Sequence, residues 1–345
     1  MKRRVPLHFL VLASTGLIFC SQAASTQPIA DQTGMAILMP ASLDGGIFEA
    51  QVLLDRAGFG PGVIDGRHGR FFVAALTAFQ QARSIKPTGK LDAPSLAALR
   101  HDTAPAIIRM VLKDEALDAP FIPNLPSRIA DQAGLPYLGY RDIVEKLAER
   151  FHTTPATLLA LNSGLSSPKA GAQLVLPGLI PADRADETGI EPKWRQMLTS
   201  LNIAASQPQA ARIVVSKAQS VLKVYDASDR LVAQFPATTG SEHDPLPLGK
   251  WAIKGTAFLP TYHYNPDLFW DASKGDAKAQ LNPGPNSPVG VVWIDLDKPH
   301  YGIHGTPEPS TIGRSESHGC IRLSNWDAAR LAQMVTPETV AEFIA

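Results

Sequence analysis

The stretches that decide the fold of this 345-residue chain are YGIHGT at residues 301–306 and SHGCIRLSN at residues 317–325. A cysteine attacks as its thiolate, and an ordinary thiol with a pKa of about 8.5 is mostly protonated at neutral pH, so Cys320 needs a base or a cation beside it. His318 lies two residues away, and in an extended segment the two side chains would share one face. His304 lies sixteen residues upstream and would arrive from a neighbouring strand. The two stretches therefore predict a cysteine nucleophile served by a histidine base.

Glycines accompany both histidines in these stretches. Gly305 and Gly319 allow positive φ angles and leave room for a substrate against the main chain. The amides of Gly319 and Cys320 would then face the oxygen on which negative charge develops during acyl transfer.

Two other uses of the histidines are weighed against this hypothesis. Zinc could be held by His300, His304, His318 and Cys320, but the glycines that crowd the thiol and a spacing unlike that of zinc sites count against it. Five further histidines have no partner in the sequence and are expected to be surface or hydrogen-bonded residues: His68, His101, His152, His243 and His263. Of these, His263 lies in a segment that would border the active-site cleft.

From Arg212 onward the apolar pattern changes from helical to strand-like. Short apolar or alternating segments predict strands at residues 213–215, 222–225, 231–235, 251–253 and 289–296. Only residues 327–335 are expected to form a helix in this region. Short strands with little helix between them favour a sandwich or a small barrel.

The motifs of this region resemble the L,D-transpeptidase (YkuD-like) catalytic domain. The resemblance rests on HGT at 304–306, SHGCIR at 317–322, Asn325, PLGKW at 247–251 and NPGPNSPVG at 282–290, and it spans residues 211–345. It implies a mainly-β sandwich that uses no cofactor or metal. The histidine also precedes the cysteine, whereas papain-like peptidases place the nucleophile first.

The resemblance also assigns roles to single residues. It implies that Cys320 is the nucleophile, that His304 is the general base and that the carbonyl of Gly305 orients His304. His318, Gly319 and Cys320 would shape the oxyanion site. Ser317, Arg322 and Asn325 match motif positions and are assigned to substrate binding or to support of the loop.

Residues 45–103 are expected to form a small helical domain. Apolar residues at helical spacing predict helices at 47–57 and 72–79, and Asp92 with Pro94 opens a third through Leu99. Three short helices with the loop GVIDGRHG at 62–69 resemble the peptidoglycan-binding module of cell-wall hydrolases and transpeptidases. A generic three-helix packing unit is the alternative.

Residues 137–180 are expected to form a small α+β module. Asp142 and Glu145 form a capping box, Thr154-Pro155 begins a second helix, and residues 174–177 read as a strand. Helix, helix and strand resemble the latter part of a LysM glycan-binding module, but residues 135–140 lack its usual first strand, so a structural spacer is the alternative. The segments between these units are expected to be linkers: residues 25–44, 104–136 and 181–210.

Residues 1–24 are expected to be a secretory signal peptide. Three of the first four residues are basic, residues 7–19 are almost wholly apolar, and Ser21, Ala23 and Ala24 supply small residues for cleavage. The apolar run is shorter than a membrane-spanning helix needs, so we expect no permanent span after cleavage and a location in the periplasm. Removal of the leader takes Cys20 with it and leaves Cys320 as the one remaining cysteine, so no intramolecular disulfide is expected.

The charge balance bears on the partners. The 32 Lys and Arg residues equal the 32 Asp and Glu residues, so the basic excess typical of nucleic-acid-binding proteins is missing at the level of the whole chain. The family resemblance implies peptidoglycan stem peptides and glycan as partners, with attack on the bond between a diamino acid and D-alanine. The acyl group would pass to a second stem (a 3-3 cross-link), to water or to an outer-membrane lipoprotein. Hydrolysis of an existing link between the wall and such a lipoprotein is a further alternative. A peptidoglycan-binding protein with an inactive catalytic domain is the non-enzymatic alternative.

Overall fold

The computed structural model describes residues 28–165, 167–181, 190–272 and 275–345. The predicted signal peptide lies outside these residues. Within them, no helix combines the length and the apolar character that crossing a bilayer requires.

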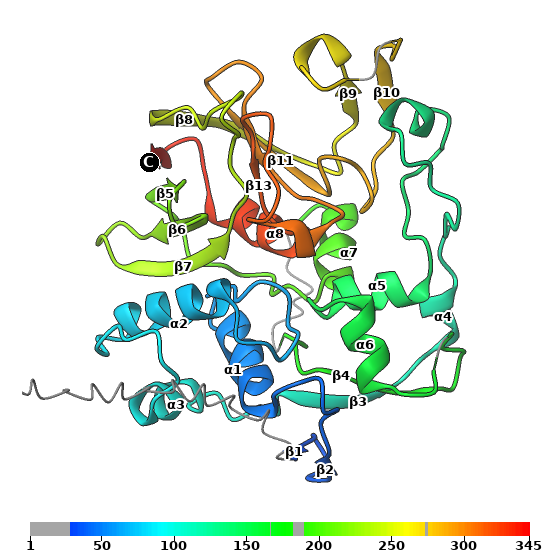
Figure 1. Cartoon of the computed structure of the whole chain (residues 1–345), viewed down its shortest axis with the longest axis vertical. Coiled ribbons are helices and arrows are strands. Elements are labelled where there is room, and N and C mark those ends of the chain that lie inside the picture. Colours follow the sequence, from blue (N-terminus) through cyan, green and yellow to red (C-terminus); the bar gives the residue numbers. More distant parts are fainter. Residues whose placement is uncertain (1–27, 166, 182–189, 273–274) are drawn as a thin grey trace, which may run out of the picture.

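The helical domain near the N-terminus contains the three predicted helices (Figure 1). The Asp44 carboxylate accepts the Ile47 amide at the start of α1, and Asp92 does the same for Ser95 at the start of α3. Buried leucine and phenylalanine side chains of α1 and α2 form the core between them. The helices are α1 (Gly45–Arg56), α2 (Arg70–Ala82) and α3 (Ala93–Leu99).

The second module has two strands rather than the single predicted one. Strand β3 (Ile107–Val111) pairs antiparallel with β4 (Gln173–Pro177), and α5 (Ile143–Arg150) and α6 (Pro155–Leu161) lie between them in sequence. The assignment of residues 104–136 to a linker was therefore wrong. The strand was missed because its partner β4 lies far along the chain. Helix α4 (Asp114–Leu117) and the 3-10 helix η1 (Ile129–Gln132) lie between β3 and α5. The LysM-like identity of this module stays a prediction.

The other two predicted linkers are also packed in part. The short strands β1 (Ile29–Ala30) and β2 (Ala36–Ile37) form a hairpin, and Ile37, Met39 and Leu43 are buried in the core of the second module. Helix α7 (Pro192–Ser200) buries Trp194 and Leu198 in the core of the catalytic domain. Apolar side chains at these positions fold both segments onto their neighbours.

The catalytic domain is built on one eight-stranded sheet in the order β13-β12-β11-β8-β14-β5-β6-β7. Strand β8 joins its two halves, and a register shift where it pairs with Leu296 marks an irregularity there. The prediction of a mainly-β catalytic domain is confirmed. Its strands are β5 (Arg212–Ser216), β6 (Val221–Tyr225), β7 (Leu231–Pro236), β8 (Gly249–Phe258), β11 (Val292–Leu296), β12 (Gly302–His304), β13 (Ile321–Arg322) and β14 (Val340–Ile344).

Helix α8 (Asn325–Met334) packs against β11 and β12 and lies at the centre of the molecule (Figure 1). A separate hairpin of β9 (Tyr262–Tyr264) and β10 (Ala279–Leu281) stands beside the sheet, with the 3-10 helix η2 (Pro266–Leu268) in its connection. A further 3-10 helix, η3 (Pro309–Thr311), lies between β12 and β13.

A buried polar cluster joins the three modules at α8. The Asp55 carboxylate of α1 lies 2.5 Å from the Arg330 guanidinium and 3.1 Å from Nδ1 of His152. The His152 ring stacks on Trp326 at 4.8 Å, and its Nε2 lies 2.8 Å from the Leu201 carbonyl oxygen. Burial opposes ionisation of Asp55, but the charges of Arg330 and His152 outweigh it and hold the pKa of Asp55 below its usual value. The expectation that His152 is hydrogen-bonded is confirmed.

We predict that Arg330→Met lowers the free energy of unfolding by about 3 to 5 kcal/mol, because it leaves the Asp55 carboxylate buried without its cation. Denaturant titration followed by tryptophan fluorescence and circular dichroism measures the loss. The control is Arg230→Met, which removes an exposed ion pair with Asp226 and should leave the midpoint almost unchanged. Equal midpoints for the two variants would contradict the prediction.

Candidate active site

Parallel pairing of β12 with β13 brings the two glycine-rich stretches together. Ile303 pairs with Ile321 and His304 with Arg322, so the side chains of His304 and Arg322 share one face of the sheet. Cys320 directly precedes β13, two residues before Arg322. The Arg322 charge acts on both the His304 imidazole and the Cys320 thiol, so both groups lie within electrostatic range of Arg322.

His304 is buried and has a fixed tautomer. Its Nδ1 lies 2.7 Å from the carbonyl oxygen of Gly305, and because a carbonyl can only accept, Nδ1 carries the proton and Nε2 keeps its lone pair. The indole of Trp293 stacks on the ring at 5.4 Å. Burial and the Arg322 charge lower the pKa of His304 to about 3, although the bond to Gly305 acts in the opposite direction. The ring is therefore a neutral base at physiological pH.

Cys320 is half-buried, and its sulfur lies 3.6 Å from the carbonyl oxygen of His300. Burial raises the pKa of the Cys320 thiol, while the Gly302 amide and the Arg322 charge partly offset this effect. Cys320 is thus a thiol at neutral pH. This differs from the expected thiolate, because the sequence does not reveal how strongly the thiol is desolvated.

Ser317 stabilises the loop that precedes Cys320 through hydrogen bonds. The Ser317 hydroxyl donates to the Cys320 carbonyl oxygen at 2.5 Å, and the Ser317 amide donates to Thr239. Gly319 has a φ of +96°, and a Cβ there would lie 2.6 Å from the Tyr301 ring, so this position requires glycine. Among the described residues, none accepts a hydrogen bond from the amides of Gly319 and Cys320.

His318 does not direct its ring to the thiol. Its Nε2 lies 2.7 Å from the Asp271 carboxylate, and Phe269 meets the ring edge-on at 4.8 Å. Of the two candidate bases, this leaves His304. The alternative zinc site is not assembled: in the part of the chain that the structure describes, no three His, Cys, Asp or Glu side chains are grouped to hold a metal ion.

Two of the predicted substrate-binding residues lie below the surface. Asn325 is fully buried at the start of α8 and Ser317 is 2% exposed, so neither side chain is accessible for direct contact with a substrate. Their motif positions alone did not show on which side of the loop they lie. Arg322 is half-buried and remains beside the thiol.

The sequence reasoning missed the aromatic residues around the thiol. Burial and the Cys320 charge raise the pKa of the Tyr262 phenol to about 12, with a smaller effect of Tyr264 in the same direction and of Arg322 in the opposite one. Strand alternation places Tyr262 and Tyr264 on one face of β9 and the exposed His263 on the other. The sequence singled out His263, whereas its neighbour Tyr262 borders the site. The alternation Tyr-His-Tyr was the signal that could have shown this.

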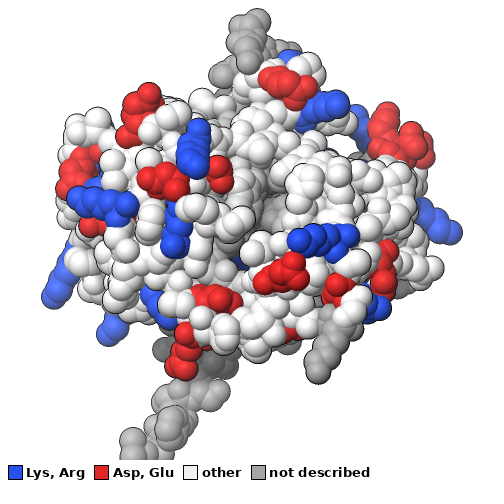
Figure 2. Space-filling view, turned by 90° about the horizontal axis from the view of Figure 1, so that it is seen from above, with Lys and Arg blue, Asp and Glu red and all other residues white. Residues whose placement is uncertain are grey.

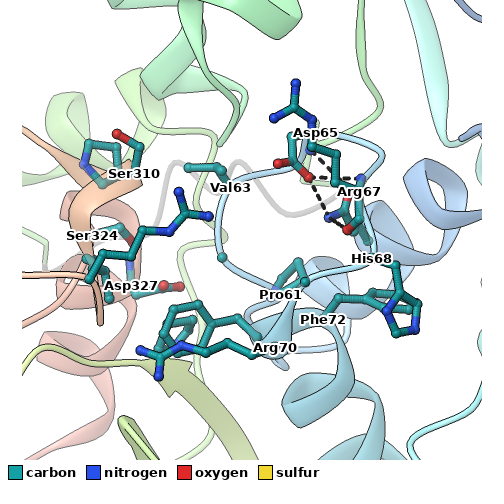
Figure 3. Close-up of a pocket in the computed structure, with 18 of the residues that line it drawn as sticks. Pro61, Val63, Asp65, Arg67, His68, Arg70, Phe72, Ser310, Ser324 and Asp327 are labelled. Carbon is teal, nitrogen blue, oxygen red and sulfur yellow. Dashed lines mark hydrogen bonds between the residues drawn. The ribbon is translucent and has the colours of Figure 1, made fainter. Parts of the chain in front are cut away.

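A separate cavity of about 490 Å³ lies between the helical domain and the catalytic domain (Figure 3). The loop before α2 forms one wall, and residues 309–314 form another. Arg70 crosses between the walls and donates to the Gly313 carbonyl oxygen. Arg67 and Arg314 are exposed at this cavity, and among the described residues neither guanidinium has an acidic partner.

The surface above the sheet carries charges of both signs. Figure 2 shows Lys and Arg interspersed with Asp and Glu over this face, and a hollow near its centre that is surrounded mainly by uncharged residues. The face that includes the β9–β10 hairpin is therefore not a continuous basic or acidic surface.

Two family models match this chain. The L,D-transpeptidase catalytic domain (YkuD) model matches residues 210–342, and the model described as "Putative peptidoglycan binding domain" matches residues 44–99. The chain is 30% identical over 196 residues to the "Putative L,D-transpeptidase YkuD" of Bacillus licheniformis, across 56% of this chain and 88% of that protein. It is 28% identical over 200 residues to the Bacillus subtilis protein of the same name, with the same coverage.

A crystal structure of an L,D-transpeptidase from Xylanimonas cellulosilytica aligns over 93% of this chain and 98% of that chain, at 13% identity and a TM-score of 0.36. A score this low adds nothing to the assignment, which rests on the sequence matches. With a helical peptidoglycan-binding domain ahead of its catalytic sheet, the chain belongs to the L,D-transpeptidase (YkuD) family.

Proposed function

We propose that this protein is a peptidoglycan L,D-transpeptidase in which Cys320 is the nucleophile and His304 the general base. The observation that carries the proposal is the neutral His304 imidazole, with its proton fixed on Nδ1, on the same sheet face as Arg322, two residues after Cys320. A base with a free Nε2 beside a protonated thiol can take the thiol proton as the sulfur attacks.

The first half-reaction releases D-alanine. The Cys320 sulfur bonds to the carbonyl carbon that joins the diamino acid to D-alanine, and the thiol proton passes to Nε2 of His304. The amides of Gly319 and Cys320 meet the developing oxyanion, each contributing on the order of 3 kcal/mol. His304 then returns the proton to the leaving amine, the C–N bond breaks, and a thioester remains.

The second half-reaction restores the thiol. A side-chain amine of another stem attacks the thioester and gives its proton to His304, and the proton passes to the departing sulfur. The product is a 3-3 cross-link. Water in place of the amine gives carboxypeptidase activity, and a lysine of an outer-membrane lipoprotein gives a protein-linked wall.

Export to the periplasm is part of the proposal. The basic and apolar N-terminal residues favour secretion, and peptidoglycan lies on that side of the inner membrane. The peptidoglycan-binding domain at residues 44–99 supports the same polymer as substrate.

We predict that Cys320→Ala abolishes release of D-alanine from a purified tetrapeptide stem, because the bond to sulfur cannot form. Chromatography of the muropeptides measures D-alanine and any dimers. The matched control His263→Ala alters an exposed residue of β9 and should retain wild-type turnover. Release of D-alanine by the alanine variant at position 320 would refute the nucleophile, and a wild-type protein that only binds peptidoglycan would favour the non-enzymatic alternative.

We predict opposite reactivities toward two thiol reagents. Because burial raises the pKa of the Cys320 thiol, iodoacetamide should alkylate it more slowly than free cysteine at neutral pH, with a rate that rises toward alkaline pH. A carbapenem should acylate it quickly, since His304 removes the proton during attack. Mass spectrometry follows both adducts. His304→Asn should abolish only the second reaction, and equal loss of both would count against a base role.

The cavity between the two domains would anchor the protein to peptidoglycan. Stem peptides carry carboxylates, and the exposed guanidinium groups of Arg67 and Arg314 are available to bind them. Deletion of the helical domain is unsuitable as a test, because it would remove Asp55 from Arg330 in the catalytic domain.

We therefore predict that Arg67→Ala/Arg314→Ala weakens sedimentation with isolated sacculi while turnover of a small soluble stem stays unchanged. The control Arg83→Ala/Arg230→Ala removes the same charge from exposed positions that do not line the cavity. Equal sedimentation of the two double variants would overturn the assignment.

A further inference from the structure

Glu149 of the second module reaches into the catalytic domain. It lies on α5, its side chain is almost wholly buried, and its Oε1 accepts a hydrogen bond of 2.8 Å from the Asn325 side-chain amide. Its Oε2 accepts a bond of 2.5 Å from the Tyr140 hydroxyl. A carboxylate from an accessory module thus contacts a residue of the catalytic motif directly.

The contact fixes the orientation of the Asn325 amide. Nδ2 donates to Glu149 and also to the Pro285 carbonyl oxygen at 3.0 Å. Oδ1 accepts from the Val291 amide at 3.1 Å. Rotating the amide by half a turn would set two acceptors against Oδ1 and two donors against each other, so the observed orientation is strongly preferred.

Asn325 in turn supports the residue that orients the base. A Cβ built on Gly305 would lie 2.2 Å from Oδ1 of Asn325, so the amide packs directly against the Gly305 backbone. The Gly305 carbonyl accepts the Nδ1 proton of His304. A chain of direct contacts therefore runs from Glu149 through Asn325 and Gly305 to His304.

We propose that Glu149 is a positioning residue, which holds His304 in the tautomer with a free Nε2 through Asn325 and Gly305. The proposal rests on the role of His304 as base in the proposed function. It makes the second module part of the catalytic apparatus through the contact of Glu149 with Asn325.

The groups around Glu149 indicate which variant should conserve its role. Burial raises the pKa of Glu149 to about 7, the bonds from Tyr140 and Asn325 oppose this, and the Glu145 charge adds to it. Tyr137, which feels the charge of Glu149, is the other titratable neighbour. Oε1 can accept from Asn325 whether or not the carboxyl is protonated, and the amide oxygen of a glutamine can do the same.

The test compares Glu149→Ala and Glu149→Gln in the full chain. The alanine variant should lower kcat for stem cleavage by about 10- to 100-fold with little change in KM, because the base is misplaced and no substrate contact is lost. The glutamine variant should restore most of kcat. Asp55→Asn is the control, because it weakens the buried contact of α8 with α1 without touching Asn325, and it should lower stability while kcat per folded molecule is unchanged.

Nitrogen NMR of the histidine side chains gives a readout that needs no turnover. His304 should show a protonated Nδ1 in the wild type, in Glu149→Gln and in Asp55→Asn, and a mixture of tautomers in Glu149→Ala. If the alanine variant does not fold, Glu149→Met fills the volume without an acceptor and takes its place. Unchanged kcat and an unchanged tautomer in a folded variant without the acceptor would overturn the proposal. An inactive wild type would instead refute the proposed function, and the NMR result would still decide the role of Glu149.

Discussion

The contact between Arg330 and Asp55 is the constraint on which the arrangement of the modules depends. Both side chains are buried, and two charges withdrawn from water are tolerated only when they remain together. His152 completes the cluster from the second module. Because α8 contributes Arg330 and Trp326 to this cluster and also packs on β11 and β12, the accessory modules are fixed to the sheet that carries the site.

The catalytic site depends on a short piece of regular structure. Strand β13 has two residues, and its parallel pairing with β12 brings together residues that a long loop separates in sequence. Buried supports compensate for so little hydrogen bonding: Ser317 holds the loop from within, and Asn325 holds the backbone next to His304. Cys320 is half-exposed, whereas the residues that hold its loop and the neighbouring backbone are buried.

Features that depend on residues close together in the sequence were predicted correctly. Contacts between residues far apart in the sequence were not predicted. Asp92, Asp142 and Thr154 cap the helices that they were expected to cap, since each cap acts within three residues. The motif residues Cys320 and His304 could be singled out because their chemistry is specific. Strand β3 could not be found, because its partner β4 is far along the chain. The pairing of Asp55 with Arg330, 275 residues apart, and the burial of Asn325 depend on tertiary packing that a single sequence does not display.

The packed connections have a consequence for how the protein works on an insoluble network. A catalytic domain on a flexible linker would reach every polymer strand within the length of that linker. Here residues 309–314, which line the cavity together with the helical domain, are part of the loop that leads to Cys320. Under the proposed function, a polymer segment bound in this cavity would therefore lie at a fixed separation from the thiol.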